Sequence, residues 1–401
     1  MKRLFKTSGK VFLTMFLLGS LLFASVMNNT RASGEEISLF HDVVDVAAGI
    51  QYLAALKSDG TVSLAKLSYS FEPGSEEEKL VDFANNEYRI PVDMGILQSE
   101  VSEWRDIESI EVFRFSDDAG YDQCEILVGL DKNGKLHLAG GFSPRSQEYY
   151  HDYVLSYFQV DDWSDVISFS TCRRLLMGVR SDGRLYLTGC IDGAENIESL
   201  AENASNALSV KLTWSNQGPF AACLFRDGRL GMGDYDYEKD EWYIRYLAED
   251  VQDFDVSQSI TVALHTDGTV SDSWWENKVF DWPDVAQVCA EGAYICVVKQ
   301  NGDVFRVTPD GSEQFELLDI GFKDIKHIYT NHSGNRMYGI LGLKNDGSIV
   351  TELTEHAPQI DLSDWTDIAD IFFPAEDIVY VAGLKQDGRL IVSDNVTAEV
   401  Y

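Results

Sequence analysis

Residues 54–62 read AALKSDGTV, and this pattern of an apolar strand, an Asp-Gly turn and a second apolar strand recurs eight times in the 401-residue chain. Asp-Gly and Asn-Gly supply the positive φ angles that tight hairpin turns require. The flanking alternation of apolar residues fits two antiparallel strands, and a further apolar strand precedes each hairpin. The turn glycines are Gly60, Gly134, Gly183, Gly228, Gly268, Gly302, Gly347 and Gly388.

The spacing of these glycines gives the size of the unit. Successive glycines lie 34 to 49 residues apart, except for a gap of 74 residues between Gly60 and Gly134. Units of about 40–50 residues are typical of one four-stranded propeller blade. The sequence therefore predicts an all-β fold, a closed β-propeller of seven or eight blades. The eight turns leave the number open, because one copy can be split or degenerate.

A second signature precedes the first strand of several units. It consists of an aromatic residue, any residue, Asp, and then Ile or Val. The aromatic positions are Trp104, Trp163, Trp282, Trp365 and Phe322. Tryptophans can stack on a ligand, but recurrence at one place in each unit favours packing within the blades.

The first unit resembles a repeat of the regulator of chromosome condensation family, since residues 45–49 read DVAAG and residues 55–62 read ALKSDGTV. Diverged copies extend the resemblance over residues 40–395. It implies a closed propeller, typically of seven blades, in which closure removes sheet edges. The family has a secreted bacterial branch, which includes an inhibitor of β-lactamases that binds with one propeller face.

The chain departs from the family pattern at the corner after Gly49. Residues 50–52 lack the usual histidine there, so no site is carried over from that residue, and other packing must close the corner. One way to complete the ring is for residues 37–40 to add the missing outer strand to the last unit. That pairing would join both ends of the chain in one blade.

The N-terminus has the composition of an export signal. Four basic residues within positions 2–10 precede an apolar run over residues 11–27, and small residues follow up to position 32. The alternative is an uncleaved anchor, because a run of about 17 residues matches the shortest membrane-spanning helices. We expect residues 1–32 to be a signal peptide, and residues 33–401 to form one propeller domain, secreted or at the cell surface.

Charge and composition limit the partners of the exported chain. Removing five of 32 basic residues leaves 27 against 66 acidic ones, a formal charge of −39. Such a surface repels nucleic acids and anionic membranes. Apolar residues make up 45% of the chain, enough for a large core, so disorder is not expected.

The six cysteines show no metal-ligand spacing such as CxxC, so we expect neither a metal nor a cofactor. Most lie in apolar strand-like runs and are expected to be buried thiols. A disulfide between Cys289 and Cys296 across a hairpin stays open. The cysteines are Cys124, Cys172, Cys190, Cys223, Cys289 and Cys296.

Long insertions gather at one predicted face. Loops between first and second strands, and loops after third strands, leave a blade at the same end. Loops on a rigid scaffold tend to carry function, and Tyr and Trp are enriched at binding hot spots. The insertions are residues 68–87, 142–153, 234–241, 116–123, 214–219 and 331–336. The candidate contact residues are Tyr121, Tyr149, Tyr150, Trp214, Asp234, Tyr235, Asp236, Tyr237 and Trp242.

These features favour a monomeric extracellular module that binds a protein partner and is not an enzyme. One alternative is a lectin-like propeller that binds cell-wall glycan, although no recurring polar set is evident in the repeats. A propeller glycosidase or lyase is a further alternative, but no catalytic motif is present. The acidic stretch at residues 234–241 offers oxygens for calcium, yet it lacks the EF-hand spacing.

Overall fold

The computed structural model divides the chain into two units, Met1–Glu35 and Glu36–Tyr401. Only part of the chain is described. The described residues are 40–69, 92–116, 123–141, 154–189, 194–215, 218–236, 239–257, 260–273, 279–280, 282–291, 294–309, 315–333, 336–353, 360–374 and 380–401. All of them belong to the second unit. The predicted signal peptide lies outside the described residues. Among the described residues, no helix is long and apolar enough to cross a membrane.

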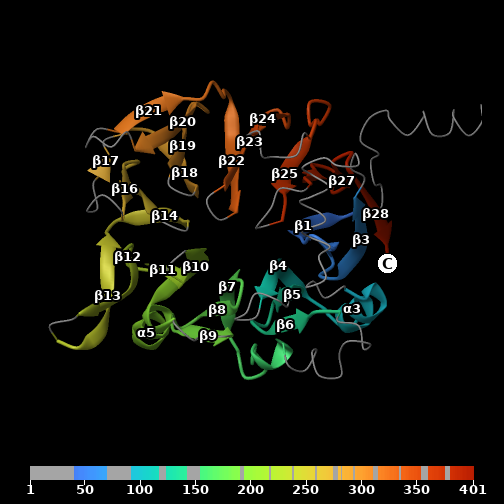
Figure 1. Ribbon diagram of the computed structural model, residues 1–401, viewed down its shortest axis with the longest axis horizontal. Coiled ribbons are helices and arrows are strands. Elements are labelled where there is room, and N and C mark those ends of the chain that lie inside the picture. Colours follow the sequence, from blue (N-terminus) through green and yellow to red (C-terminus); the bar gives the residue numbers. More distant parts are fainter. Residues whose placement is uncertain are drawn as a thin grey trace, which may run out of the picture. The chain divides into compact units, whose positions relative to one another are not determined.

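Eight antiparallel sheets occupy the described part of the chain, one for each predicted turn (Figure 1). The first three contain β1 (Val43–Ala48), β2 (Tyr52–Lys57), β3 (Val62–Tyr69), β4 (Ile107–Ser116), β5 (Gln123–Asp131), β6 (Leu136–Ala139), β7 (Val166–Cys172), β8 (Leu175–Arg180) and β9 (Leu185–Gly189). The fourth and fifth contain β10 (Ala207–Ser215), β11 (Gly218–Phe225), β12 (Leu230–Asp236), β13 (Glu241–Ala248), β14 (Val251–Val256), β15 (Thr261–His265), β16 (Val270–Asp272) and β17 (Val279–Phe280). The last three contain β18 (Val285–Glu291), β19 (Tyr294–Lys299), β20 (Val304–Pro309), β21 (Phe315–Asp319), β22 (Ile325–Ser333), β23 (Arg336–Lys344), β24 (Ile349–Leu353), β25 (Ile368–Phe372), β26 (Ala382–Lys385) and β27 (Leu390–Val392). Strand β28 (Val396–Val400) follows, and helices α3 (Met94–Val101) and α5 (Glu195–Asn203) lie between sheets in the chain.

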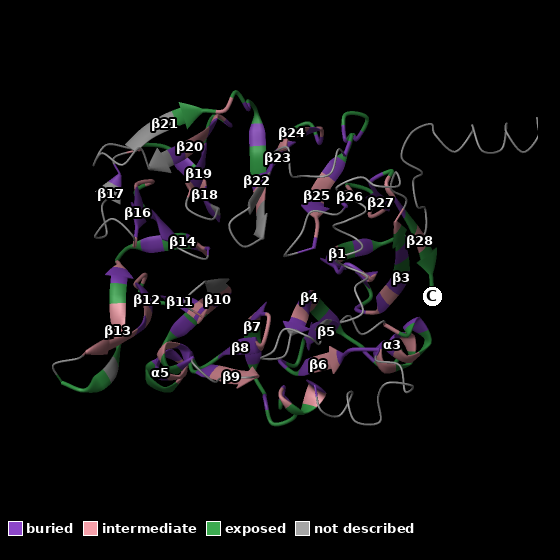
Figure 2. Cartoon of the chain, in the orientation of Figure 1, coloured by how far each residue is buried: buried purple, intermediate pink, exposed green. Residues whose placement is uncertain are grey.

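The sheets follow one another around a centre, with the first strand of each innermost (Figure 1). Strand β1 contacts β4, and the contacts continue through β7, β10, β14, β18 and β22. Strand β25 of the last sheet contacts β23 behind it and β1 ahead of it, so the order returns to the first sheet. Buried residues run along the strands of every sheet (Figure 2). This arrangement is that of a β-propeller with eight sheets in the described residues.

The first and last strands of the described chain meet in one sheet. The C-terminal strand β28 pairs with β3, from Val396↔Tyr69 to Val400↔Ala65, and supplies the outer strand of the first sheet. Of residues 37–40 only Phe40 is described, so the predicted pairing of this segment with the last sheet lies outside the described residues. A tight turn follows β27, in which Val396 N donates to Ser393 O at 3.2 Å, and β28 then runs beside β3.

One Asp or Asn before each inner strand explains the recurring Asp of the second signature. In all eight units this residue has a φ between 56° and 73°, a left-handed region that Asp and Asn tolerate better than most residues. Its carbonyl accepts a hydrogen bond from the hairpin turn of the same unit at 2.7–3.1 Å. The eight residues are Asp42, Asp106, Asp165, Asn206, Asp250, Asp284, Asp324 and Asp367.

The signature tryptophans pack inside the blades. Trp104, Trp163 and Trp365 are 5–7% exposed, which confirms the packing interpretation for these three. Each ring lies against a glycine of the second strand, where a Cβ would come within 2.5–2.8 Å of Trp Cζ3. Trp282 is only partly buried and stacks on Phe280 with ring centroids 4.3 Å apart.

The corner that lacks the family histidine is closed by a carboxylate of the next sheet. Glu125 accepts hydrogen bonds from the backbone nitrogens of Ile50 and Gln51, the latter at 2.9 Å. From the opposite side, the Tyr380 hydroxyl donates to Gly49 O at 2.8 Å. The first corner therefore joins the first sheet to the second and to the last.

Candidate interaction site

Three of the six predicted insertions, at residues 214–219, 234–241 and 331–336, fall largely within the described residues, where they mostly continue the strands. The insertion at 142–153 and nearly all of those at 68–87 and 116–123 lie outside the described residues. Asp234 and Asp236 belong to β12, Glu241 begins β13, and Trp214 lies within β10. The sequence-based expectation of irregular loops at 214–219, 234–241 and 331–336 is therefore wrong for most of these residues. The backbone is extended because cross-strand pairing satisfies its polar groups up to the turns. Both hairpins of the fourth sheet still open at the same end, as predicted.

The hairpin of β12 and β13 leaves its sheet as a two-stranded ribbon. Pairing between β11 and β12 stops at Cys223↔Gly231, whereas β12 and β13 stay paired as far as Asp236↔Glu241. Residues 232–236 and 241–245 are therefore paired only with each other among the described strands, and we call them the ribbon. Strand β13 is exposed at Glu241, Tyr243 and Tyr246, and buried toward its end at Leu247 (Figure 2).

Helix α5 supports one face of the ribbon. The helix contacts both β12 and β13, and a Cβ on Gly233 would lie 1.7 Å from Asn196 O. This close approach requires a glycine at position 233. Because side chains alternate along a strand, the opposite face carries Met232, Asp234, Asp236, Glu241, Tyr243 and Arg245.

Ion pairs hold this outer face of the ribbon. Asp234 Oδ2 lies 2.7 Å from Arg245 Nε, and Asp236 Oδ2 lies 2.9 Å from Lys239 Nζ. The hydrogen bond with Asp236 raises the pKa of Lys239 above its usual value. Exposed pairs add little stability individually, but they fix long side chains in one arrangement. Among the described residues, no group of three or more His, Cys, Asp or Glu is placed to hold a metal ion.

The structure brings together some of the predicted contact residues. Asp234 and Asp236 lie on the outer face of the ribbon. Tyr235 faces the α5 side, and its hydroxyl donates to Asp240 at the tip. Trp214 and Trp242 have described backbones in the same sheet. Predicted residues outside the described part are Tyr121, Tyr149, Tyr150 and Tyr237.

Tyr243 and Arg245 are among the outer-face residues that sequence reasoning missed. Tyr243 pairs with Asp234 across the ribbon and is 38% exposed. Arg245 forms the ion pair with the same Asp234. The alternation of polar and aromatic residues over 241–246 could have indicated that these residues form a strand. It does not show which residues of another strand lie opposite them.

The first strand of every sheet carries a polar residue at the same position. The pairing of the first strand with the second shifts by one residue after its first paired position, and the first-strand residue that follows the shift is polar. These residues share a position but differ in type, so they are not the recurring polar-aromatic set that equivalent sugar pockets would need. The eight residues are Asp45, Ser109, Ser168, Ser209, Asp253, Gln287, His327 and Asp370.

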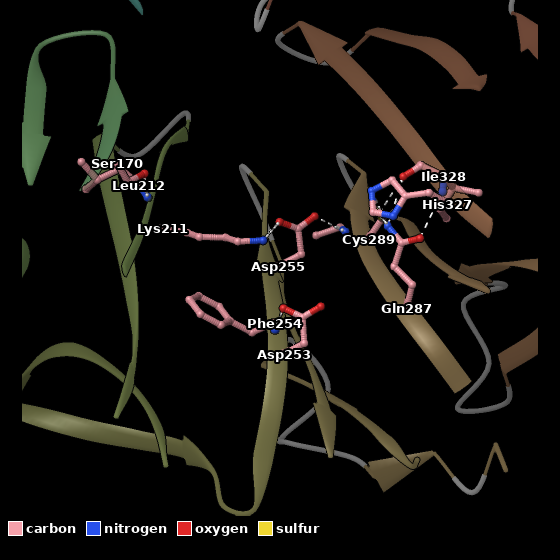
Figure 3. A network of polar contacts seen from close by, with 11 residues as sticks. Ser170, Lys211, Leu212, Asp253, Phe254, Asp255, Gln287, Cys289, His327 and Ile328 are labelled. Atoms are coloured by element: carbon pink, nitrogen blue, oxygen red, sulfur yellow. Dashed lines mark hydrogen bonds and ion pairs between the residues drawn. The ribbon is translucent and has the colours of Figure 1, made fainter. Parts of the chain in front are cut away.

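Inner-strand side chains connect neighbouring sheets (Figure 3). Lys211 Nζ on β10 lies 2.9 Å from Asp255 Oδ1 on β14, and the other Asp255 oxygen accepts from Ala290 N on β18 at 2.9 Å. Burial lowers the pKa of Lys211, but Asp255 more than offsets this and leaves it raised. Gln287 bonds both the N–H and the carbonyl of Ile328 on β22, each at 3.1 Å. These contacts fix the register between adjacent sheets.

The second and third sheets are also connected by inner-strand side chains, and the carboxyl group in this contact has a raised pKa. The Thr171 hydroxyl on β7 donates to Glu111 on β4. Burial raises the pKa of Glu111 to about 7, the Thr171 hydrogen bonds oppose this shift, and the charge of Asp45 on β1 adds to it. Burial also raises the pKa of Asp45. Glu111 is therefore half protonated near neutral pH.

We expect Glu111→Gln to raise the free energy of unfolding at pH 8 by about 1–2 kcal/mol, allowing for solvent screening of this half-buried group. The pKa of Glu111 in the folded chain exceeds its value of about 4.3 in the unfolded chain. The free energy of unfolding of the native chain therefore falls as the pH rises from about 4 to 7. Glutamine keeps an acceptor for Thr171 and carries no charge. Urea unfolding at pH 4, 6 and 8 measures the difference, which should nearly vanish at pH 4.

The exposed Glu108 on the same strand provides a matched control. Glu108→Gln should leave the pH dependence of stability unchanged. If Glu111→Gln and the native chain have parallel stability curves over this pH range, the proposed cost of ionising Glu111 is contradicted.

Comparison with known proteins gives similarity of structure alone. No family model matches the chain, and no curated protein matches its sequence. A computationally designed protein, Ika8, aligns with 12% identity and a TM-score of 0.49 over 90% of this chain and 97% of its own. The Dos1 propeller aligns with 12% identity and a TM-score of 0.43 over 90% and 93%. Prp20p from Saccharomyces cerevisiae, a structure described with binding to Gsp1p and histones, aligns with 10% identity and a TM-score of 0.41 over 71% and 81%. Similarities at this level assign the chain to no family and to no partner.

Proposed function

We propose that the chain is an exported binding module whose ribbon contacts a protein partner outside the cell. The observation that carries the proposal is the departure of the ribbon from its sheet with its outer face turned away from α5. A lone two-stranded hairpin is marginally stable in water, so the contacts of helix α5 with β12 and β13 are needed to hold it. The proposed export rests on the basic and apolar N-terminus.

The outer face of the ribbon has the composition of a protein-binding surface. Tyr243 and Arg245 belong to residue types enriched at binding hot spots. The pairing of Arg245 with Asp234 holds both side chains before binding, which lowers the entropy lost on association. The high negative charge of the chain favours a neutral or basic partner.

A glycan is the second candidate ligand. Tyr243 presents an exposed aromatic ring beside the carboxylate of Asp234, and an aromatic ring beside a polar group also suits sugar stacking. The outer face fits a glycan less well than a protein, because a single ring with one carboxylate offers few hydrogen bonds to a sugar. We therefore favour the protein partner.

The test is retention of culture-medium and cell-wall components on immobilised residues 36–401. We expect Tyr243→Ala to weaken retention of a protein at least tenfold, about 1.4 kcal/mol, which lies within the usual range of a hot spot. Leu318→Ala is the matched control, since Leu318 is a 50% exposed apolar residue on β21 of another sheet. It should retain the partner as the native chain does.

The other outcomes are informative. Retention of wall glycan by the native chain, with loss in Tyr243→Ala, would move the proposal to the lectin alternative. A protein retained equally by all three baits would overturn the ribbon as the contact surface. Retention of nothing would contradict the binding module in these extracts.

A further inference from the structure

Cys289 and Cys296 lie directly opposite each other on neighbouring strands. They are paired in the register of β18 with β19, so their side chains project from the same face of the sheet. Both belong to the buried cluster that packs against the seventh sheet, together with Ile325 and Ile328. The two sulfur atoms therefore face the same space between two blades.

The backbone geometry of such a pair suits a disulfide. Directly opposed residues in antiparallel strands have Cα atoms about 4.5–5.5 Å apart. Disulfides span Cα separations of about 4.4–6.8 Å, so the bond requires a side-chain rotation and no movement of the strands. The other described cysteines, Cys124, Cys172 and Cys223, lie on three separate sheets.

Folding order decides when this bond can form. Only residues 292–293 separate β18 from β19, so the thiols meet as soon as the hairpin closes. In the folded chain Cys289 is 8% exposed and Cys296 is not exposed, which excludes an oxidant from both. The oxidation must therefore precede docking of this hairpin against the seventh sheet.

We propose that Cys289 and Cys296 form a cross-strand disulfide during folding outside the reducing cytoplasm. Two thiols react with the disulfide of a thiol–disulfide oxidant, either an exported oxidoreductase or oxidised glutathione. One protein S–S bond forms, the S–S bond of the oxidant breaks, and both protons and both electrons pass to its two product thiols. The inference rests on the proposed function only for the oxidising compartment.

The bond joins two strands of the sixth sheet at its contact with the seventh. In the thiol form, Cys289 Sγ donates weakly to Ile328 O at 3.7 Å. Gln287 Nε2 also bonds Ile328 O, at 3.1 Å. Oxidation removes the weak S–H donor, while the stronger amide hydrogen bond remains. The contact between the sheets therefore survives the reaction.

The experiment is refolding of residues 36–401 in a mixture of oxidised and reduced glutathione, followed by unfolding and alkylation of thiols with N-ethylmaleimide. We expect intact mass spectrometry to find four alkylated cysteines of the six, and six after prior reduction. A non-reducing peptide map should show Cys289 and Cys296 in one linked peptide pair. The Cys289→Ser variant should show five alkylated cysteines.

Six alkylated cysteines in refolded native chain would overturn the proposal. So would four alkylated cysteines with a different linkage, or glutathione attached to either residue. The measurement on the native chain stands even if Cys289→Ser fails to fold. Because the refolding mixture supplies the oxidant, a negative result leaves the proposed export and the ribbon untouched.

Discussion

Ending the chain at Asn395, which removes β28, is expected to lower the free energy of unfolding by about 3–6 kcal/mol, at about 1 kcal/mol for each lost backbone hydrogen bond plus the lost burial. Strand β28 pairs with β3 at five positions, and Val396 is 5% exposed. Without β28, the last sheet still contacts the first through β1, which touches β25 and β26, and through the buried cluster that the two sheets share. We expect a lower urea midpoint, measured by tryptophan fluorescence.

Removal of Tyr401 alone is the matched control for this truncation. Tyr401 is 44% exposed and contributes one backbone hydrogen bond, from its N–H to Leu64 O at 3.0 Å. Its loss should cost about 1 kcal/mol or less. If the longer truncation costs no more than the loss of Tyr401, the ring does not depend on β28, and the inner contacts between Val43 and Gly388 suffice.

Features that depend on local chemistry were predictable from the sequence. A turn that needs positive φ selects Asp-Gly or Asn-Gly, as at Gly60, and eight such turns correspond to eight sheets. The Asp of the second signature follows the same rule, because Asp42 and its equivalents adopt a left-handed conformation. The position of each inner strand is therefore encoded within a few residues.

Pairings between distant segments were not predictable from the sequence. Strand β28 is short, and nothing in its sequence identifies β3, more than 300 residues earlier in the chain, as its partner. The turn after Leu390–Val392, in which Val396 N donates to Ser393 O, precedes this pairing. The ribbon depends similarly on α5, whose approach to Gly233 becomes visible only in three dimensions.

The polar residues of the inner strands were missed for a different reason. Asp253, Gln287 and His327 occupy one structural position but differ in charge, size and hydrogen-bonding capacity. A search for one recurring residue type fails on such a set. The register shift before each of them is the feature they share, and the partners differ: Gln287 bonds Ile328 of the next sheet, whereas Asp253 accepts from the neighbouring Phe254 N.

Replacement of Gly178 by alanine is expected to destabilise the protein by about 1–3 kcal/mol, the usual cost of overpacking a core. The new Cβ would lie 2.8 Å from Trp163 Cζ3 and 3.2 Å from Cε3. Gly178 does not have a positive φ, so backbone strain does not contribute and the clash accounts for the loss. Urea unfolding of the native chain and of Gly178→Ala measures this difference.

The native repeats show how the clash is relieved. In the fourth sheet the equivalent pair is Ala204 with Cys223, and in the fifth it is Ala248 with Ala263, so in these two sheets a small residue at the signature position accompanies a residue larger than glycine. In the sixth sheet Trp282 accompanies Val297 but is only partly buried and stacks on Phe280. Trp163→Ala alone should cost about 3–5 kcal/mol, because it leaves a cavity above the glycine.

The double variant Trp163→Ala with Gly178→Ala reproduces the pair of the fifth sheet. We expect its loss of stability to be smaller than the sum of the two single losses by at least about 1 kcal/mol, a coupling typical of residues in contact. Additive losses would contradict the packing role assigned to the signature tryptophans. They would instead indicate that Gly178 is required for some other reason, since Trp163 would then not be the group that an added Cβ meets.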